Sequence, residues 1–531
     1  MSQSTQAISK PSSPAWQNWS QNLHYQGDNY YYTPRNRAEL QAIISNAAAQ
    51  NKQVRVSGQR HSQTPLVASS ETPTSKFFIV DLSCYADLGN EGDQRMQLGS
   101  DGSSVTVNTG VREDELDAFL TQNKLMLETV TAGGFFSLGG MTAVDVHGAT
   151  VQAPIFAETV SAFVIMGPDG VVTTIDASTP RVGLWSPLQF ARVSLGTLGV
   201  VTAVTIKVLP RPYANSLTSG ITDSVWENTH DFSNGMASLL ASKTRLEIFF
   251  NPYALTGTSN FTTAWWDVEA GSGAAPVPQP AADACQLAQR QEFGAPYLPF
   301  GENIAEDAAL YAQSFDAPIV GTAAASVITS TAISVIKSEV RAAGKNNSDL
   351  WLGDAARVIF MSYFIELPDL TPASLSKIWT VLKSVSDKVN KTSNFHIAAP
   401  MEFRFIKGGD TAMAGTYTSK ANAHFVNLDL IAFVAVNASK TGLDYPAKML
   451  SFFAEVESEW VALGGWPHNG KMYGFYDPAT GPGAATPPFN PAFLSHLRSR
   501  RPERVQAFDD YRQSRDPKGM FVNPYVARLL G

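Results

Sequence analysis

The sequence predicts an α+β protein with more than one domain. Segments with apolar residues at helical spacing occur alongside segments that alternate or run continuously apolar, as strands do. The chain has 531 residues, and a prior of about 150 residues per domain suggests two to four domains. After Arg211-Pro212 the chain becomes richer in Phe, Trp and Tyr. We expect the first domain to end there, near residue 215.

The composition excludes several classes of protein. There are 39 basic and 47 acidic residues, a net charge of −8, and no long basic run, so nucleic acid is not an expected partner. Cys84 and Cys285 are the only cysteines, which excludes a disulfide-dense scaffold and a cysteine-based metal cluster, and no metal site is expected. One disulfide and two free thiols fit equally well. No secretory leader is visible, although a leader removed before this sequence begins would leave the same pattern.

The first half opens with an arm, residues 1–28, expected to be loose, whose Trp16 and Trp19 could dock on the body. The pattern Asn36-x-x-Glu39 is a capping box, and apolar residues follow at i, i+3, i+4 and i+7 from Leu40, which predicts an amphipathic helix. The other elements predicted here are strands at 77–82, 105–111, 160–166, 171–175 and 200–209 and a helix at 114–125.

Residues 54–66, VRVSGQRHSQTPL, form a strand that ends in Ser57-Gly58 and a polar turn that carries Arg60, His61 and Ser62. Glycine lets the backbone approach a ligand closely, and successive N–H groups of a turn form an anion-binding concavity. Alone, a Gly-x-x-His turn is more often only a turn. The segments that follow decide whether this one holds a cofactor.

Two glycine-rich segments follow the turn. Residues 131–150, TAGGFFSLGGMTAVDVHGAT, carry five glycines, and residues 194–208, SLGTLGVVTAVTIKV, carry two. Such segments suit backbone that passes close to a flat or phosphorylated ligand, although tightly packed turns also use glycine. No G-x-G-x-x-G fingerprint stands at a strand-to-helix junction, so a Rossmann cofactor site is not indicated.

The second half is predicted to mix strands and helices. We expect strands at 244–253, 357–367, 399–405 and 428–436, helices at 375–389 and 449–463, a turn at 464–470, and loops at 270–280 and 480–491. Residues 319–336 are the least charged stretch and have about the length of a short membrane span. Their Ala, Ser, Thr and Gly content favours a buried or cavity-lining helix.

The strand at 399–405 carries Glu402 and Arg404 two residues apart, so both side chains share one face. A surface ion pair is the ordinary interpretation of Glu-x-Arg. The flanking apolar residues indicate burial instead, and buried charges are uncommon unless they are paired or functional. Glu247 is similarly isolated in an apolar run.

Four segments in register resemble the FAD-linked oxidases of the vanillyl-alcohol-oxidase/p-cresol-methylhydroxylase type. They are VRVSGQRHS, TAGGFFSLGG with its DVHGA end, SLGTLGVVTAVTIKV, and the DPKGMFVN tail. Within that family the chain looks most like the bacterial class II cholesterol oxidases, which carry covalent FAD, with alditol and aldonolactone oxidases as the nearest rivals. The resemblance implies a two-domain α+β fold, with an FAD-binding domain (1–215), a substrate-binding cap (216–505) and a C-terminal segment (506–531) that returns to the FAD domain.

By position, the resemblance implies that His61 is joined through a ring nitrogen to the methyl carbon of the flavin, which suits imidazole as a nucleophile near neutral pH. The alternative is a hydrogen-bonding turn histidine beside noncovalent FAD. For His147 a structural role is expected. The residues expected to hold FAD are Ser57, Gly58, Gln59, Arg60, His61, Ser62, Thr131, Gly133, Gly134, Ser137, Gly139, Gly140, His147, Gly196, Gly199, Val200 and Asn523.

Oxidation of an alcohol by a flavin needs an acceptor for the hydroxyl proton and positive charge beside the anionic reduced flavin. The resemblance implies that Glu402 and Arg404 face the flavin. It also implies that Glu247 is a second carboxylate that acts with the arginine as a gate, and a buried salt bridge is the equal alternative.

The turn WPHNGK resembles the PHWGK element of sugar-lactone relatives, which makes Asn469 and Lys471 candidate catalytic residues. Asn469 stands where an aromatic residue is expected, and this departure weakens the lactone interpretation. Asn427 and Asn437 are equal candidates to offer an amide to the substrate hydroxyl.

The expected reaction is oxidation of the 3β-hydroxyl of a sterol to the ketone, with or without isomerisation to the 4-en-3-one, while O2 becomes H2O2. The cap's aromatic residues favour a deep apolar cavity only mildly, whereas a polyol oxidase would need several polar partners. The alternative is an alditol, sugar or aldonolactone oxidase on the same fold. A flavin-storing or interaction protein is disfavoured, because Glu402, Arg404 and His61 are all in place.

We expect an exported monomer without a stable membrane span, which contacts a membrane surface transiently to extract sterol. A cytoplasmic location stays open.

Overall fold

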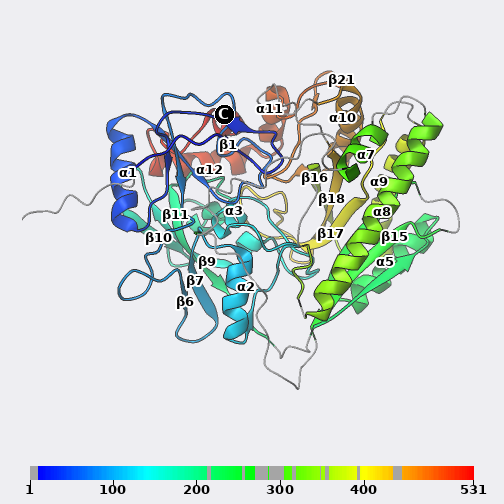
Figure 1. Cartoon of the computed structure of the whole chain (residues 1–531), viewed down its shortest axis with the longest axis horizontal. Coiled ribbons are helices and arrows are strands. Elements are labelled where there is room, and N and C mark those ends of the chain that lie inside the picture. Colours follow the sequence, from blue (N-terminus) through cyan, green and yellow to red (C-terminus); the bar gives the residue numbers. More distant parts are fainter. Residues whose placement is uncertain are drawn as a thin grey trace, which may run out of the picture.

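The computed structural model describes residues 10–211, 217–253, 258–268, 285, 304–313, 318–346, 348–352, 358–391, 395–433 and 445–531. Two lobes stand side by side in Figure 1. The N-terminal lobe, blue to cyan, is joined by the red C-terminal helices, and the cap lobe, green to orange, is built on one large sheet.

A three-stranded parallel sheet in the order β3-β5-β4 begins the N-terminal lobe. It consists of β3 (Tyr31–Tyr32), β4 (Gln53–Ser57) and β5 (Phe77–Asp81), and α1 (Arg37–Ala49) precedes β4. Half of the predicted capping box forms, because the Asn36 side chain accepts a hydrogen bond from the Glu39 backbone N–H at 3.0 Å. The Glu39 carboxylate accepts instead from the backbone N–H of Arg35, at 2.9 Å.

A five-stranded antiparallel sheet in the order β10-β9-β11-β7-β6 completes this lobe. It consists of β6 (Met96–Leu98), β7 (Ser104–Asn108), β9 (Val160–Met166), β10 (Val172–Asp176) and β11 (Val200–Lys207). The other elements are α2 (Glu113–Gln122), β8 (Leu125–Met126), α3 (Leu138–Ala143), the 3-10 helix η1 (Phe156–Thr159), α4 (Pro187–Ala191) and β12 (Leu209–Pro210). The predicted hairpin is confirmed, with Met166 paired to Val172 across the turn.

The cap lobe is built on a seven-stranded antiparallel sheet in the order β13-β15-β14-β17-β18-β16-β19. Its strands are β13 (Leu217–Ser224), β14 (Arg245–Phe250), β15 (Phe261–Val268), β16 (Val358–Leu367), β17 (Met401–Lys407), β18 (His424–Phe433) and β19 (Trp466–Pro467). The helices of this lobe are α5 (Thr229–Ser242), α7 (Ile304–Gln313), α8 (Pro318–Lys345), α9 (Pro372–Lys391) and α10 (Ala447–Ala462). On one face Trp379 of α9 contacts Phe261, whereas Ile333 and Val340 of α8 pack with Phe249 and Trp266.

Helix α8 contains the stretch that was predicted to be buried, and that prediction is half wrong. One side packs on the sheet, whereas Ile319 is 85% exposed and Val327 is 66% exposed. The helix is long and apolar enough to span a membrane by length and composition, and 22% of its most apolar window is buried. Composition could not show that only one stripe of the helix faces the sheet.

Residues 10–28 are a docked segment rather than a loose arm. In this segment β1 (Trp16–Gln17) pairs with β2 (His24–Tyr25). Trp16 is 2% exposed, and its indole N–H donates to Ser57 Oγ at 3.1 Å. The expected docking of this tryptophan is thus confirmed, and the burial of its ring fixes the segment beside β4.

The predicted loop 480–491 contains a short strand, β21 (Gly481–Ala485), which pairs with β20 (Tyr476–Asp477). The loop predicted at 270–280 lies outside the described residues.

Two long-range links join distant parts of the chain. Cys84 and Cys285 form a disulfide with an S–S distance of 2.10 Å across a sequence separation of 201 residues, so the disulfide alternative is correct. The last three helices of the chain are α11 (Pro491–Arg500), α12 (Pro502–Arg515) and α13 (Pro524–Leu530). Val54 of β4 donates its N–H to the Met520 carbonyl at 2.8 Å, which brings the tail to the N-terminal lobe. The boundaries at 215 and 505 stay predictions.

Candidate active site

A cavity lies between the lobes, where the loop after β4 meets the sheet of the cap lobe. The loop after β4, the segment around α3 and the residues before β11 form one wall, and strands β14, β16, β17 and β18 with the turn at 468–471 form the other. The predicted site residues that line it are Ser57, Gly58, Gln59, Arg60, His61, Ser62, Thr131, Gly133, Ser137, Gly139, Gly140, His147, Gly196, Gly199, Glu247, Glu402, Arg404 and Lys471.

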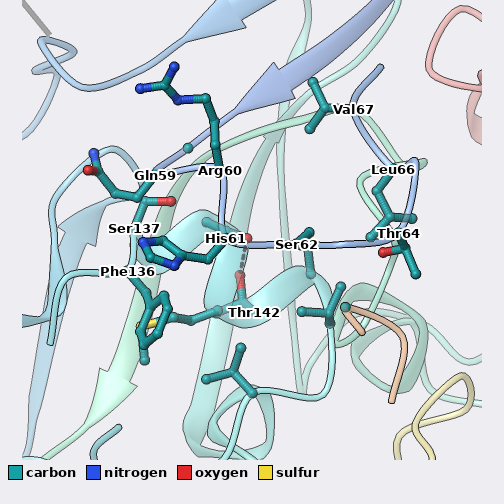
Figure 2. A pocket seen from close by; sticks show the side chains of 18 of the residues that line it. Gln59, Arg60, His61, Ser62, Thr64, Leu66, Val67, Phe136, Ser137 and Thr142 are labelled. Carbon is teal, nitrogen blue, oxygen red and sulfur yellow. Dashed lines mark hydrogen bonds between the residues drawn. The ribbon is translucent and has the colours of Figure 1, made fainter. Parts of the chain in front are cut away.

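His61 is held between aromatic rings. Its imidazole stacks on Trp19 and on Phe135, with ring centroids 5.2 and 4.9 Å away, and meets Phe136 edge-on at 4.8 Å. Figure 2 shows the imidazole beside the Phe136 ring, with the Arg60 side chain directed away from it. Burial first, and then nearby positive charges, lower the pKa of His61 to about 3. The imidazole is therefore neutral at physiological pH and keeps a nucleophilic nitrogen.

The glycines of the N-terminal wall allow close packing that a side chain would prevent. A Cβ on Gly58 would lie 1.9 Å from Ser137 Oγ, so a side chain there would force the loop and α3 apart. Gly199 has a φ of +132°, and a Cβ there would lie 2.5 Å from the Met166 carbonyl oxygen. Only glycine suits such a backbone conformation and such close packing.

The tail holds the loop from behind. The Asn523 side chain, predicted to touch FAD, donates to the Pro65 carbonyl at 2.8 Å and caps α13 by accepting from Val526 N–H. Asn523 does not line the cavity, so that assignment is wrong. Asn523 instead fixes the far end of the loop, and through this contact the C-terminal tail supports the N-terminal wall of the cavity.

Gly134 and Val200 also lie outside the cavity lining. Gly134 forms a turn with a φ of +69°, where its N–H donates to Thr131 Oγ1 and its carbonyl accepts from Asp114 N–H. Val200 is fully buried and packs with Met166. Because strand side chains alternate, its neighbour Val201 lines the cavity instead.

The cap wall presents a polar stripe that crosses neighbouring strands. Glu402 of β17 is the direct partner of Asp429 of β18, and Asp429 is the direct partner of Ser362 of β16. Arg404 is paired with Asn427 one step along the same strands. Since alternate residues of a strand share a face, these five side chains lie on one side of the sheet.

Arg404 is paired with two carboxylates, Glu402 on its own strand and Glu247 on β14. Glu247 is 2% exposed and also accepts a hydrogen bond from Trp351 Nε1 at 2.9 Å. The predicted meeting of Glu402 and Arg404 is confirmed. For Glu247 the structure shows the buried salt bridge, formed where the residue also lines the cavity.

Burial shapes the charges of this wall. It raises the pKa of Glu402 well above its usual range, against the influence of Arg404, and raises that of Asp429. Burial lowers the pKa of Lys471. For Arg404 burial acts against the charge, but Glu247 and Glu402 outweigh it and raise the pKa. Burial thus favours the protonated form of Glu402, whereas Arg404 favours its ionised form.

Lys471 lies over the Phe360 ring, with Nζ 3.8 Å from the ring centroid. The turn that carries it is anchored by Asp145, which accepts hydrogen bonds from the backbone N–H and the side-chain amide of Asn469 at 2.7 and 2.6 Å. Asn469 does not line the cavity. Its assignment as a catalytic residue is therefore wrong, and it is a positioning residue for the turn.

His147 lines the cavity with its ring edge towards Phe364, at 5.5 Å between centroids, and lies 5.9 Å from His468. Burial, with a contribution from Arg404, lowers its pKa to about 3. The ring is therefore a neutral group between the two walls.

Sequence reasoning missed Asp429, Ser362 and Trp351, which all line the cavity. Asp429 carried a usable signal, because it is an isolated carboxylate in an apolar strand, as Glu247 is. Asn427 is fully buried and donates to Ser362 Oγ at 2.9 Å rather than lining the cavity. Asn437, the other amide candidate, lies outside the described residues.

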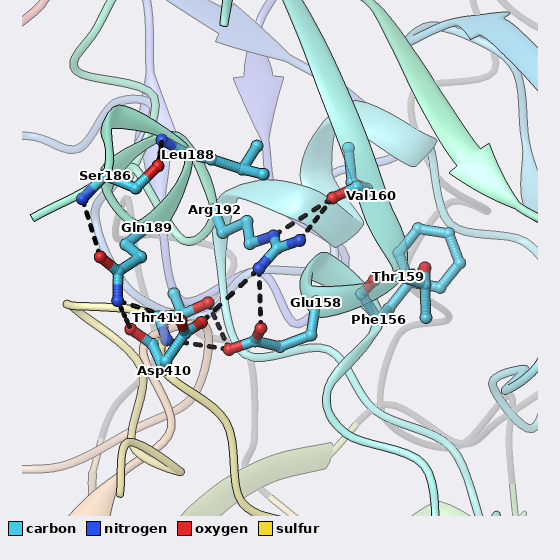
Figure 3. A network of polar contacts seen from close by, with 10 residues as sticks. All are labelled: Phe156, Glu158, Thr159, Val160, Ser186, Leu188, Gln189, Arg192, Asp410 and Thr411. Carbon is cyan, nitrogen blue, oxygen red and sulfur yellow. Dashed lines mark hydrogen bonds and ion pairs between the residues drawn. The ribbon is translucent and has the colours of Figure 1, made fainter. Parts of the chain in front are cut away.

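A second contact between the lobes lies around Glu158 (Figure 3). Arg192 Nη1 pairs with Glu158 at 2.9 Å and with Asp410 at 3.6 Å, and Thr411 N–H donates to Glu158 at 2.9 Å. Gln189 adds a hydrogen bond to the Asp410 carbonyl at 3.1 Å. The connection between β17 and β18 is thereby fixed to the N-terminal lobe, which holds the two walls in place.

Two family profiles match the chain, one for an FAD binding domain over residues 29–176 and one for D-arabinono-1,4-lactone oxidase over residues 372–529. L-gulonolactone oxidase of Mus musculus is 28% identical over 196 residues, which is 37% of this chain and 40% of the relative. D-arabinono-1,4-lactone oxidase of Yarrowia lipolytica is 25% identical over 182 residues, 34% of this chain and 32% of the relative. The chain therefore matches less than half the length of these curated relatives.

Solved structures match over almost the whole chain. Cholesterol oxidase from B. sterolicum has a TM-score of 0.69 at 15% identity, with 98% of this chain and 97% of that chain covered. A solvent-stable cholesterol oxidase has a TM-score of 0.67 at 16% identity, with 98% of each chain covered. At such identity the likeness establishes the fold.

The residues of the N-terminal wall fit FAD. Gly58 and Gly199 allow the close backbone packing that shapes this wall of the cavity, and the neutral His61 lines the same wall. The fold, the two matched profiles and this cavity agree, and the chain is a member of the FAD-linked oxidases of the vanillyl-alcohol-oxidase/p-cresol-methylhydroxylase type.

Proposed function

We propose that the protein oxidises a CH–OH carbon of a small polyhydroxylated molecule, an aldonolactone or alditol, with O2 as the electron acceptor. The observation that carries this proposal is the number of polar groups on the cap wall, where Glu402, Asp429, Arg404, Ser362 and the Lys471 of the adjoining turn all line the cavity. A substrate with several hydroxyls needs several polar partners, whereas an apolar substrate gains nothing from them. The relatives named for gulonolactone and arabinonolactone support the same class.

FAD, when bound, supplies the acceptor for the hydride that leaves the substrate carbon. Glu402 in its ionised form takes the hydroxyl proton, since it lines the cavity beside Arg404 and burial raises its pKa, which makes the carboxylate a stronger base. Arg404 keeps Glu247 and Glu402 in place and brings fixed positive charge to the site of developing negative charge. Lys471 adds a second cation to the cavity wall, from the turn whose next residue, Met472, pairs with Met361 of β16.

His61 is proposed as the covalent attachment point, through a bond from an imidazole nitrogen to the methyl carbon of the flavin. Its neutral ring, held between Trp19 and Phe135, supports this role. Acid precipitation tests it, because attached flavin stays with the pellet and free flavin stays in solution. His61→Ala is expected to move the colour to the supernatant, and colour that stays with the variant's pellet would place the bond elsewhere.

A sterol is the second candidate substrate. The likeness of the fold to two cholesterol oxidases supports it, as do the apolar side chains of Trp351, Leu352 and Phe360 in the cavity lining. Under this alternative the 3β-hydroxyl meets Glu402 and Arg404, and the remaining polar groups lack partners.

Peroxide release from the purified flavoprotein decides between these substrates. L-gulono-1,4-lactone, D-arabinono-1,4-lactone, xylitol and cholesterol are offered at equal concentration, with cholesterol dispersed in detergent and detergent alone as the control. A higher kcat/KM with a lactone or alditol is expected. Turnover of cholesterol alone would contradict the proposal and establish the sterol alternative.

We also propose that the protein is exported. The Cys84–Cys285 disulfide supports this, because structural disulfides persist mainly in oxidising compartments. Thiol counting on denatured protein taken directly from its native cells tests it: no free thiol is expected, and two free thiols would contradict export. Monomeric state and transient membrane contact stay predictions.

A further inference from the structure

We infer that Asp429 forms a second substrate subsite, which accepts a hydrogen bond from a hydroxyl one or two carbons away from the carbon that is oxidised. This inference rests on the proposed function and narrows it, because it requires a diol rather than an isolated alcohol. Glu402 then meets the reacting hydroxyl, and Asp429 meets its neighbour.

One oxygen of Asp429 lacks a protein partner. The residue is 4% exposed and lines the cavity, and within the described part of the chain its Oδ1 has no hydrogen-bond partner. An unsatisfied buried acceptor destabilises the protein, because its hydrogen bonds to water are not replaced. Such an atom at a cavity wall is explained when a bound molecule supplies the missing donor.

The other oxygen is held by the sheet. Ser362 hydrogen-bonds the Asp429 carboxylate, and Asn427 in turn donates to Ser362 Oγ at 2.9 Å. Both supporting residues are almost fully buried. The carboxylate therefore has one oxygen engaged with neighbouring strands, and its other oxygen, which is itself buried, still lacks a donor among the described residues.

The spacing of the strands fits two hydroxyls of one molecule. Glu402 and Asp429 are direct partners on β17 and β18, and the Cβ atoms of such a pair lie about 4.5–5.5 Å apart. Two carboxyl groups carried by neighbouring Cβ atoms on one face can each meet a hydroxyl on adjacent or next-adjacent carbons. Lys471 and Arg404 are the positive groups that act on Asp429 most strongly, and they offset part of the cost of the buried charge.

The test compares a diol with the matching mono-alcohol. Wild type, Asp429→Leu and Asp429→Asn are assayed for flavin reduction with xylitol and with 1-pentanol, under anaerobic conditions. Asp429→Leu is similar in size and removes both oxygens, and it is expected to lower the second-order rate constant of flavin reduction by xylitol about 10- to 100-fold more than that by 1-pentanol. Asp429→Asn keeps an acceptor oxygen and is expected to retain most of the preference for the diol.

An equal loss with both alcohols would show a structural role and overturn the inference, as would an Asp429→Leu variant with unchanged preference for xylitol. Wild-type turnover of cholesterol but of neither test alcohol would instead overturn the proposed function. Where Asp429→Leu does not fold, as judged by its flavin absorbance, Ser362→Ala replaces it. Loss of the Ser362 hydrogen bond to the carboxylate is expected to slow flavin reduction by xylitol several-fold more than that by 1-pentanol, and an equal effect on both alcohols would overturn the inference.

Discussion

The two walls of the cavity are built in opposite ways. The N-terminal wall uses backbone and glycines, from three short segments of continuous sequence, with one histidine held among aromatic rings. The cap wall uses charged side chains from separate strands, spread from Glu247 to Lys471. We therefore expect the first wall to be sensitive to added volume and the second to be sensitive to the loss of a single charge.

The contrast has a physical basis. A large, flat and anionic cofactor is held by close approach of the backbone and by N–H groups, which any residue other than proline supplies. A small alcohol is recognised and activated by a few charged groups in a low-dielectric site, where each interaction is strong and each unpaired group is costly. Four substitutions test this contrast between the two walls, and they follow in order from the largest expected effect to the smallest.

Glu402→Gln is expected to slow flavin reduction about 1,000-fold, the usual scale of a lost general base. Since burial raises the pKa of Glu402, the acid form dominates at low pH and cannot accept a proton. The wild-type rate of reduction therefore rises as pH rises through the raised pKa and levels off above it. Stopped-flow absorbance at a series of pH values measures this, and a variant that keeps the wild-type profile would remove Glu402 from the role of base.

Arg404→Ala is expected to slow flavin reduction about 100- to 1,000-fold, because the fixed positive charge at the site is lost. The variant also leaves Glu247 and Glu402 buried without their cation. Arg404→Lys is the matched control and should recover part of the rate. FAD content is expected to stay at the wild-type level in both variants. An unchanged rate of flavin reduction in Arg404→Ala would show that the cap wall does not depend on this charge.

Gly58→Ala is expected to impair FAD binding by about 1–3 kcal/mol, the usual cost of overpacking, while the flavin that does bind is reduced at the wild-type rate. The new Cβ would collide with Ser137 Oγ. Gly140→Ala is the matched control, because its Cβ would lie 3.3 Å from the same atom. The double variant Gly58→Ala/Ser137→Gly should restore the flavin-to-protein absorbance ratio, and its failure to do so would show that the collision is not the cause.

Asn469→Ala is expected to have the smallest effect, a few-fold rise in KM with little change in kcat. Asp145 keeps its hydrogen bond to the backbone N–H of residue 469 but loses the one to the side-chain amide. The turn that carries Lys471 is then less firmly placed. Steady-state kinetics measure this, and a loss of kcat as large as that of Glu402→Gln would return Asn469 to the catalytic group.

The glycine-rich segments and the cofactor loop could be predicted because each is local. The period-two rule also placed Glu402 and Arg404 together, since both belong to one strand. The errors arose where long-range packing decided the outcome. The Asn469 side chain donates to Asp145, and the Asn523 side chain donates to the Pro65 carbonyl behind the loop, so neither lines the cavity. Helix α8 has a suitable composition for burial, but only one of its sides meets the sheet.

By itself the sequence determined the cofactor wall, the family and the pairing of Glu402 with Arg404, because those features depend on residues a few positions apart. Only the tertiary structure decided the substrate wall and the disulfide. Asp429 meets Glu402 through the register of β17 and β18, and Cys84 meets Cys285 across 201 residues. Strand order and register are set by the burial of a whole sheet, and no short motif in the chain encodes them.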